Sequence, residues 1–302
     1  MVTRSCLVAL VLLVGCGDDG TGGAGGSGGS PPTSGGGGEG GISEGGAAPT
    51  DLTVLAWNLE QFPKTDETIS LVEQILDEVR PDVVGLEEIG EEADWQTLVG
   101  ALDDYEGVLA MSGDGFSRVA MLYRPDRVQV SDAKMAFADD SYAFPRPMLT
   151  VHVQLNDAPE ENFLYGVVHL KAQLDQESED RRRSACIKLD QWINEQQQAG
   201  VEDEIVVTGD FNDELTDPQQ WNVFGPLLQS ADGGFLTLAP EQAGEFTYIP
   251  FESFIDHVLV RGGDLFQRSG AEVVKLDEDF ASYESLVSDH RPVLATIVFP
   301  PR

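Results

Sequence analysis

The run Ser288-Asp289-His290-Arg291-Pro292-Val293, near the C-terminus, places acidic and imidazole side chains at the edge of an apolar strand pattern. Three other strand patterns also have such side chains at an edge, within residues 85–89, 208–213 and 254–258. Four strands that carry carboxylates at their edges predict a convergent cluster of negative charge, which a bound cation would stabilise. These runs therefore predict the core of a metal-dependent hydrolase.

The patterns around these runs predict an α/β fold. Residues 52–58 alternate apolar and polar side chains, as a strand does, whereas residues 68–80 have apolar side chains at helical spacing before Pro81. Further helices are predicted at 95–102 and 177–198, and further strands at 81–86, 119–123, 149–155, 163–170, 205–207, 255–260 and 292–299. Because several strands follow one another directly, two packed sheets with helices outside fit better than one parallel sheet.

The N-terminus carries the pattern of an export signal. An apolar run at residues 7–14 is too short to span a bilayer but fits the core of a signal peptide. The run ends in Leu13-Val14-Gly15-Cys16, which resembles a bacterial lipobox. Residues 1–15 are therefore predicted to be a lipoprotein signal peptide, with Cys16 as the lipidated first mature residue. An ordinary signal peptide with an incidental cysteine is the alternative.

Residues 16–50 are predicted to form a flexible tether to a catalytic domain at residues 51–302. Between positions 17 and 49, glycine fills 16 of 33 positions, a composition that cannot bury apolar surface. With Cys16 lipidated, Cys186 would be the one remaining cysteine, so no intramolecular disulfide is predicted. The expected location is the bacterial cell envelope. Gly17 directly follows the predicted lipidated cysteine. Because aspartate at this position favours the inner membrane, the glycine gives a preference for the outer membrane.

The formal net charge of −35 restricts the partners of the protein. We interpret most acidic side chains as a solvated surface suited to salty surroundings. Tight non-specific binding of nucleic acid normally needs the opposite sign, because neutralisation of phosphates drives it. A nuclease that holds its substrate locally, through a metal and a few arginines, is compatible with this charge.

The available ligand types favour a hard cation. The sequence contains no Walker A motif and no zinc-binding spacing of histidine or cysteine. Oxygen ligands with few histidines favour Mg²⁺ or Mn²⁺, with Ca²⁺ as a further option, over Zn²⁺. Of the four histidines, His152 lies in mid-strand and His257 directly follows Asp256, so both are interpreted as structural.

Six short motifs occur in the order and spacing of the endonuclease/exonuclease/phosphatase superfamily. The chain resembles this deoxyribonuclease-I-like family from about residue 52 to residue 299. The motifs are Trp57-Asn58-Leu59, Leu86-Glu87-Glu88-Ile89, His169-Leu170-Lys171, Gly209-Asp210-Phe211-Asn212, Ile255-Asp256-His257 and Ser288-Asp289-His290-Arg291-Pro292. The resemblance implies a four-layer α/β sandwich of two packed mixed β-sheets flanked by helices, with the site at one sheet edge.

The resemblance also implies the roles of the catalytic residues. Asp210 would position or deprotonate the attacking water, and Asn212 would steady the phosphoryl oxygens. Asp256 would hold His290 facing the phosphate, and His169 would contact the phosphate from the opposite side. Either Asp210 or His290 could be the general base.

The metal ligands implied by the resemblance are Glu88, as the principal one, with Asn58 and Asp289. One departure from the family pattern is Glu87, where many members carry glutamine. A second carboxylate beside Glu88 adds negative charge, so the number of metals stays open.

Basic side chains are few and concentrated. Arg146, in a proline-rich segment, falls where nucleases of the family often carry a phosphate-contacting arginine. Lys171 and residues 181–183 form the main basic concentration, which would capture a polyanion near His169. The alternatives are a surface arginine at Arg146 and a charge-balanced helix start at residues 181–183.

Together these features predict a lipid-anchored, divalent-metal phosphodiesterase, with a nuclease as the leading interpretation. The expected partners are a nucleic acid substrate and the membrane through the lipid alone, without an obligate protein partner. Phosphomonoesterases acting on inositol phosphates and sphingomyelinases are alternatives within the family. An inactive binding module is a further alternative, which the intact motifs disfavour.

Overall fold

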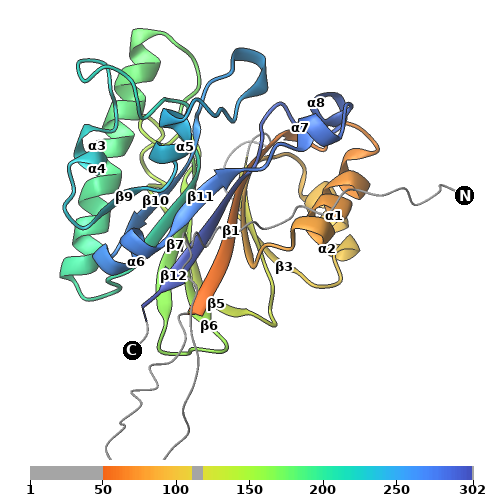
Figure 1. Ribbon diagram of the computed structural model, residues 1–302, viewed down its shortest axis with the longest axis horizontal. Helices are drawn as coiled ribbons and strands as arrows, with labels where there is room; N and C mark the ends of the chain where they lie inside the picture. The colour runs from red at the N-terminus through yellow and green to blue at the C-terminus, as the bar shows by residue number, and fades with distance from the viewer. Residues whose placement is uncertain (1–49, 111–117, 301–302) are drawn as a thin grey trace, which may run out of the picture. The chain divides into compact units, whose positions relative to one another are not determined.

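A computed structural model describes residues 50–110 and 118–300. The predicted signal peptide, Cys16 and nearly all of the predicted tether lie outside these residues. Two six-stranded sheets form the frame (Figure 1). In strand order, the first contains β11 (Gly270–Val273), β12 (Val293–Phe299), β1 (Thr50–Phe62), β2 (Val83–Ile89), β4 (Arg118–Tyr123) and β3 (Glu106–Leu109). The second contains β5 (Val128–Ala136), β6 (Met148–Leu155), β7 (Asn162–His169), β8 (Ile205–Asp210), β10 (Asp256–Arg261) and β9 (Gly233–Phe235).

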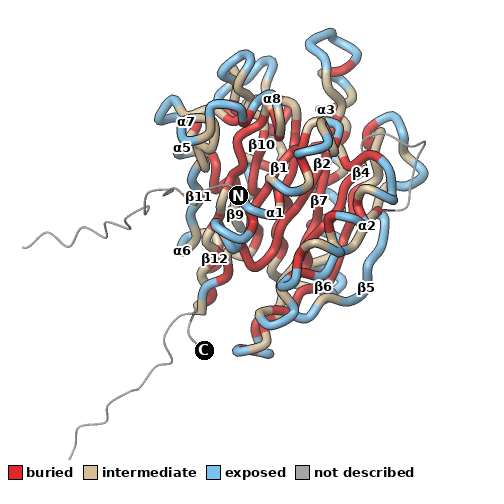
Figure 2. The backbone as a smooth tube through the Cα atoms, turned by 90° about the vertical axis from the view of Figure 1, so that its right-hand side faces the viewer, coloured by how far each residue is buried: buried red, intermediate tan, exposed pale blue. Residues whose placement is uncertain are grey.

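Both sheets are mixed. The strand pairs β1–β2 and β7–β8 are parallel, whereas β1–β12 and β8–β10 are antiparallel. The sheets pack face to face around an apolar cluster that includes Val54, Val151 and Val206. Figure 2 shows the buried strands inside and the exposed segments at the periphery.

Helices cover both outer faces. The helices α1 (Thr68–Val79) and α2 (Glu92–Ala101) pack on the first sheet, where Trp57, Val72 and Trp95 share one cluster. The helices α3 (Gln176–Gln198) and α4 (Gly225–Leu228) pack on the second sheet through a separate cluster. These layers confirm the predicted four-layer α/β sandwich.

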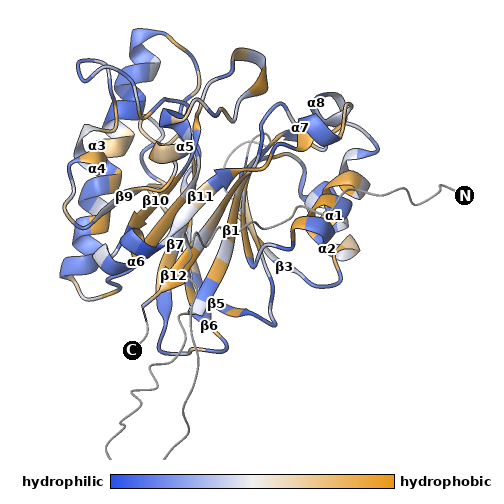
Figure 3. Cartoon of the chain, viewed as in Figure 1, coloured by the Kyte–Doolittle hydropathy of each residue, from blue (hydrophilic) through white to orange (hydrophobic). Residues whose placement is uncertain are grey.

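Local sequence explains the long helices. In α1 the buried side chains Val72, Ile75 and Leu76 recur at helical spacing, and Arg80 ends the helix in the left-handed conformation. The helix α3 begins at Asp175, whose side chain accepts a hydrogen bond from the Ser178 backbone N–H. Figure 3 shows hydrophilic and hydrophobic segments alternating along these helices, as expected for half-buried elements.

The parallel pairs bring the carboxyl ends of four strands to one edge. In the second sheet His169 pairs with Asp210 across β7–β8, and Asp256 pairs with Asp210 across β8–β10. Gly209 makes this pairing possible, because its φ is 144° and an added Cβ would lie 1.9 Å from the Val168 carbonyl oxygen. The sheet edge therefore fixes three predicted site residues side by side.

Several elements, most of them short, do not follow from the sequence patterns. They are the strands β3, β5, β9 and β11, and the helices α4, α5 (Leu238–Gln242), η1 (Ile249–Phe251), α6 (Gly263–Arg268), α7 (Leu276–Asp279) and α8 (Tyr283–Leu286). The edge strand β5 is mostly exposed, so it lacks the apolar alternation that would reveal it. Within the described part of the chain, no helix has the length and apolarity needed to cross a bilayer.

Candidate active site

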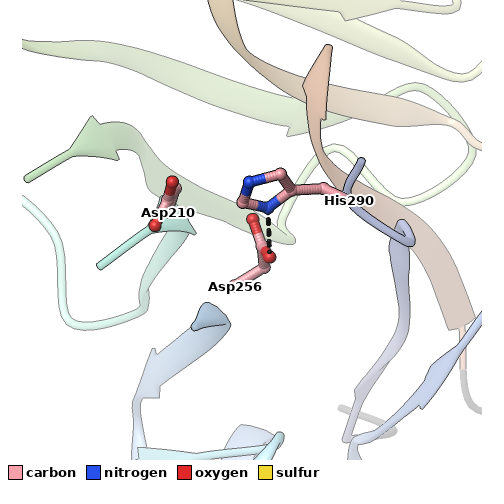
Figure 4. Close-up of side chains that lie close together, drawn as sticks. All are labelled: Asp210, Asp256 and His290. Atoms are coloured by element: carbon pink, nitrogen blue, oxygen red, sulfur yellow. Dashed lines mark hydrogen bonds and ion pairs between the residues drawn. The ribbon is translucent and has the colours of Figure 1, made fainter. Parts of the chain in front are cut away.

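A histidine–aspartate pair forms the centre of the site (Figure 4). His290 Nδ1 lies 2.8 Å from Asp256 Oδ2, and both residues are buried. Burial by itself would lower the pKa of His290, but the contact with Asp256 and the nearby Asp210 carboxylate raise it to about 10. His290 is therefore an imidazolium at neutral pH.

Asp210 faces this pair from the end of β8 (Figure 4). Its Oδ2 accepts a hydrogen bond from Asn58 Nδ2 (3.0 Å), and its Oδ1 accepts one from the Asn212 backbone N–H (2.8 Å). Burial and the Asp256 carboxylate raise the pKa of Asp210 to about 7, against the opposing effect of His290. A carboxyl group that titrates near neutrality suits proton transfer.

Glu88 and His169 lie beside Asp210. His169 Nε2 is 3.6 Å from Asp210 Oδ2 and 3.9 Å from Glu88 Oε1. Burial, Arg146 and His290 hold the pKa of His169 well below its usual value, so this imidazole is neutral. Glu88 is the more open of the two acids, with 23% of its side chain exposed.

Asp289 completes the cluster on the far side of His290. Its Oδ1 is 3.7 Å from His290 Nε2, and its backbone N–H donates to Glu60 Oε2 at 2.8 Å. Burial raises the pKa of Asp289 to about 6, and Glu60 and Glu88 act in the same direction. The sequence patterns did not identify Glu60 as a site residue, because it lies in a bulge of β1 where the pairing with β2 is interrupted, between Asn58 and Phe62.

Strained backbone marks the same region. Glu60, Gln61, Glu88 and Asn212 all have positive φ values between 43° and 61°. Such conformations are costly for residues with side chains and concentrate at functional sites. The Gln61 backbone N–H donates to Glu88 Oε2 at 2.9 Å, which shows how the bulge orients the predicted principal metal ligand.

Two sets of residues can hold a cation. Ligand atoms of Asp210, Asp256 and His290 lie within 4.8 Å of one another. In this set Asp256 Oδ1 is buried without a hydrogen-bond partner among the described residues, while Asp256 Oδ2 holds His290. Asp289 offers a buried Oδ1 without a hydrogen-bond partner, and its pKa responds to Glu88. Glu88, Asp289 and Asn58 stay the predicted ligands, since Asn58 Oδ1 accepts one hydrogen bond, from the Glu60 backbone N–H, and keeps a lone pair for a cation.

Glu87 is buried between the sheets in an unusual state. Its exposed fraction is 0%, and neither carboxylate oxygen has a hydrogen-bond partner among the described residues. Burial, followed by Asp256 and Asp210, raises its pKa well above the usual value. Burial therefore favours the neutral carboxylic acid form of Glu87, which resembles the glutamine of the family pattern in charge.

Glu87→Gln should stabilise the protein above about pH 4.5, measured as Tm with a chelator present. A carboxyl whose pKa is raised by folding loses stability as pH rises from its unfolded value toward its folded value. Each pKa unit is worth about 1.4 kcal/mol, or about 3 °C in a domain of this size. The exposed Glu195→Gln is the control, and an equal Tm difference at pH 4 and pH 8 would contradict the assignment.

Arg146 and Lys171 differ in their relation to the carboxylate cluster. The Arg146 guanidinium donates to the Leu170 carbonyl at 3.2 Å, and its pKa is lowered by burial while Glu88 and Asp210 oppose this effect. Arg146 therefore lies within electrostatic reach of Glu88 and Asp210, and its contact with a substrate phosphate stays a prediction. The Lys171 ammonium donates to the carbonyl of Ala172 at 2.9 Å, and no contact between it and the cluster occurs in the described residues.

The basic run at residues 181–183 does not form an open polyanion site. Arg181 donates to the carbonyls of Ser141 and Tyr142, and Arg182 pairs with the buried Asp213 at 2.7 Å. Arg183 donates to two loop carbonyls and to Glu179. These arginines fix the loops around α3, so capture of a polyanion by this run is not supported.

The two remaining histidines are structural, as the sequence indicated. His257 lies among aromatic rings, with its Nε2 at 2.9 Å from the Asp213 carbonyl oxygen and its Nδ1 at 3.0 Å from Thr237 Oγ1. Burial lowers its pKa to about 4. His152 contacts Glu202 at 3.0 Å, on the outer part of the second sheet.

Comparisons with known proteins place this geometry in a family context. A sequence profile described as "Endonuclease/Exonuclease/phosphatase family" matches residues 55–290. No curated protein sequence matches the chain. A Danio rerio TDP2 structure, titled as complexed with single strand DNA product, is similar at a TM-score of 0.63 and 17% identity, over 82% of this chain and 98% of that one.

Two bacterial structures are similar to the same extent. An endonuclease/exonuclease/phosphatase from Bacteroides vulgatus gives a TM-score of 0.62 at 19% identity, over 83% of this chain and 100% of that one. A family protein from Bacteroides thetaiotaomicron gives 0.61 at 18% identity, over 84% and 96%. At these identities the structures support the fold, and the profile supports the family.

Proposed function

Because the chain belongs to the endonuclease/exonuclease/phosphatase family, we propose that it is a divalent-metal-dependent phosphodiesterase that cleaves nucleic acid in the cell envelope. The observation that carries this proposal is the charged His290–Asp256 pair facing Asp210, a carboxyl with a pKa of about 7. Displacement at a phosphodiester requires a base that accepts the proton of the attacking water and a cationic donor that stabilises the charge on the phosphoryl oxygens.

In the proposed reaction, water attacks the phosphorus in line with the leaving oxygen. Asp210, oriented by Asn58 and Asn212, accepts the proton of this water through its carboxylate. The imidazolium of His290 offers its Nε2 proton to a phosphoryl oxygen, while Asp256 holds Nδ1. The P–O bond to the leaving oxygen then breaks, the leaving oxygen takes a proton from solvent, and Asp210 returns the proton of the attacking water to solvent, so that a phosphomonoester and a hydroxyl result.

Glu88 and Asp289 would hold the cation, with Mg²⁺ or Mn²⁺ as the expected ions because the donors are hard oxygens. Asn58 would add its Oδ1 to this set while its Nδ2 orients Asp210. When bound, a divalent cation supplies positive charge that offsets the charge of the phosphodiester. Arg146 and the amide of Asn212 would contact the remaining phosphoryl oxygens.

Nucleic acid is the proposed substrate, because a TDP2 relative of the same fold was solved with a DNA product. The net charge of −35 makes broad contact with phosphates unfavourable, so the substrate would be held locally at the site. The test is a panel of single-stranded DNA, duplex DNA, RNA, bis(4-nitrophenyl) phosphate, inositol phosphates and sphingomyelin, with Mg²⁺ or Mn²⁺. Cleavage confined to inositol phosphates or sphingomyelin would contradict the nuclease proposal.

Glu88→Gln should raise the Mg²⁺ concentration needed for half-maximal activity by about tenfold or more, because one anionic ligand is lost. The KM for substrate should change less. Metal titrations of both proteins, begun from the chelated state, measure the two effects. The exposed Glu92→Gln is a matched control, and activity of the wild type that survives exhaustive chelation would mean that the carboxylates do not form a metal site.

We also propose that lipid on Cys16 anchors the protein to the membrane, with the outer membrane preferred. The support is the apolar run followed by Leu13-Val14-Gly15-Cys16 and a glycine-rich segment. Cys16→Ser should move the protein from the membrane fraction to the soluble fraction while its turnover stays unchanged. A Cys16→Ser protein that fractionates with membranes as the wild type does would disprove the lipoprotein proposal.

A further inference from the structure

Two aromatic rings continue outward from His290 on the segment between α5 and β10. The ring centroid of Tyr248 lies 4.9 Å from that of His290, at an interplanar angle of 44°. Phe251 stacks on Tyr248, with centroids 5.8 Å apart and an angle of 28°. Because Phe251 is 76% exposed, the stack runs from the buried imidazole to solvent.

Backbone hydrogen bonds hold this segment together and fix it to the run that carries Asp289 and His290. The Tyr248 N–H donates to the Ser253 carbonyl at 2.9 Å, and the Ile249 N–H donates to the Asp289 carbonyl at 2.9 Å. Tyr248 also forms a β-bridge with His290. The rings therefore keep a set position relative to His290, which lowers the entropy lost when a ligand stacks on them.

A single exposed apolar side chain is common on proteins and needs no function. Phe251 differs because it extends a stack that reaches the catalytic imidazole. The two rings thus lead from the catalytic imidazole to solvent.

We propose that Tyr248 and Phe251 form a stacking platform for an unpaired base next to the scissile phosphate, so that the substrate is single-stranded nucleic acid. This inference rests on the proposed phosphodiesterase function and names the substrate of that same site. Bases stack on aromatic side chains when they are unpaired, whereas a duplex covers their faces. Stacking also needs few phosphate contacts, in agreement with the net charge of −35.

The test compares an eight-nucleotide adenine strand with a strand of equal length in which the bases are absent. The purified full-length protein should cleave the adenine strand with a kcat/KM about tenfold or more above that of the abasic strand. Phe251→Ala should lower this ratio several-fold, mainly through KM. Trp221→Ala removes another exposed aromatic side chain, 57% exposed on a loop that Arg183 holds, and should leave the ratio unchanged.

Equal kcat/KM for the two strands in the wild type, or an unchanged ratio in Phe251→Ala, would overturn the platform while the phosphodiesterase function stands. Failure to cleave either strand or bis(4-nitrophenyl) phosphate would overturn the function and the platform together. Sedimentation with phosphatidylcholine vesicles tests whether Phe251 binds a membrane instead of a base. Vesicle binding lost in Phe251→Ala, with an unchanged strand ratio, would assign the ring to a bilayer and overturn the proposal.

Discussion

Asp210→Asn is expected to lower kcat by at least about a hundredfold, because the asparagine cannot accept the proton of the attacking water. The substitution keeps the shape of the side chain and an oxygen for the Asn212 backbone N–H. The pKa of about 7 adds a second expectation, since only ionised Asp210 acts as a base. The activity of the wild type should therefore rise with pH through about 7, and this rise should disappear in the variant.

Steady-state kinetics with bis(4-nitrophenyl) phosphate across pH 5 to 9 measures both effects. Asp203→Asn is a matched control, because Asp203 is exposed on the loop before β8. The melting temperature shows whether Asp210→Asn is folded. A folded variant with turnover close to that of the wild type would mean that another group is the base.

The residues at strand ends were predictable from sequence. Asp210, Asp256 and Asp289 each stand where an apolar strand pattern meets polar residues, a change that local patterns record. That the site residues lie close together was implied through the family resemblance. Asn58 and Asp210, for example, are 152 residues apart in sequence and meet only when the two sheets pack. No local pattern contains that information.

Loop residues account for most of what sequence reasoning missed. Glu60 reaches Asp289 from a bulge with left-handed backbone, and Tyr248 reaches His290 through a β-bridge outside the long strands. Their placement depends on backbone irregularities that carry no periodic signal. The signal that was available for Glu60 is its closeness to Asn58, on the continuation of the same strand.

The arginines at 181–183 show how one charge pattern allows two interpretations. Three adjacent basic residues in an acidic chain predicted either capture of a polyanion or a charge-balanced helix start, and each donates to a loop carbonyl or a carboxylate. Composition gives the number of charged side chains, but it does not show whether carbonyls and carboxylates of neighbouring loops already accept their hydrogen bonds. Arg146, isolated in sequence, is the arginine whose pKa the Glu88 and Asp210 carboxylates raise against the effect of burial.

His290→Ala and His290→Asn should each lower kcat by at least about a hundredfold, because both remove the imidazolium that faces the phosphate. The two differ in what they leave at Asp256. Alanine leaves a buried carboxylate without its partner, whereas the asparagine amide can still donate to Asp256 Oδ2 in place of Nδ1. The alanine protein should therefore have the lower melting temperature.

The pH dependence of the melting temperature distinguishes the contribution of the His290 charge from that of its hydrogen bond to Asp256. His290 has a pKa raised to about 10, so its stabilising charge is fully present below about 6.5 and is lost as pH rises through 10. The Tm advantage of the wild type over His290→Asn should shrink over that range. If the folded asparagine protein turns over at nearly the rate of the wild type, a neutral donor suffices, and the imidazolium has no part in the reaction.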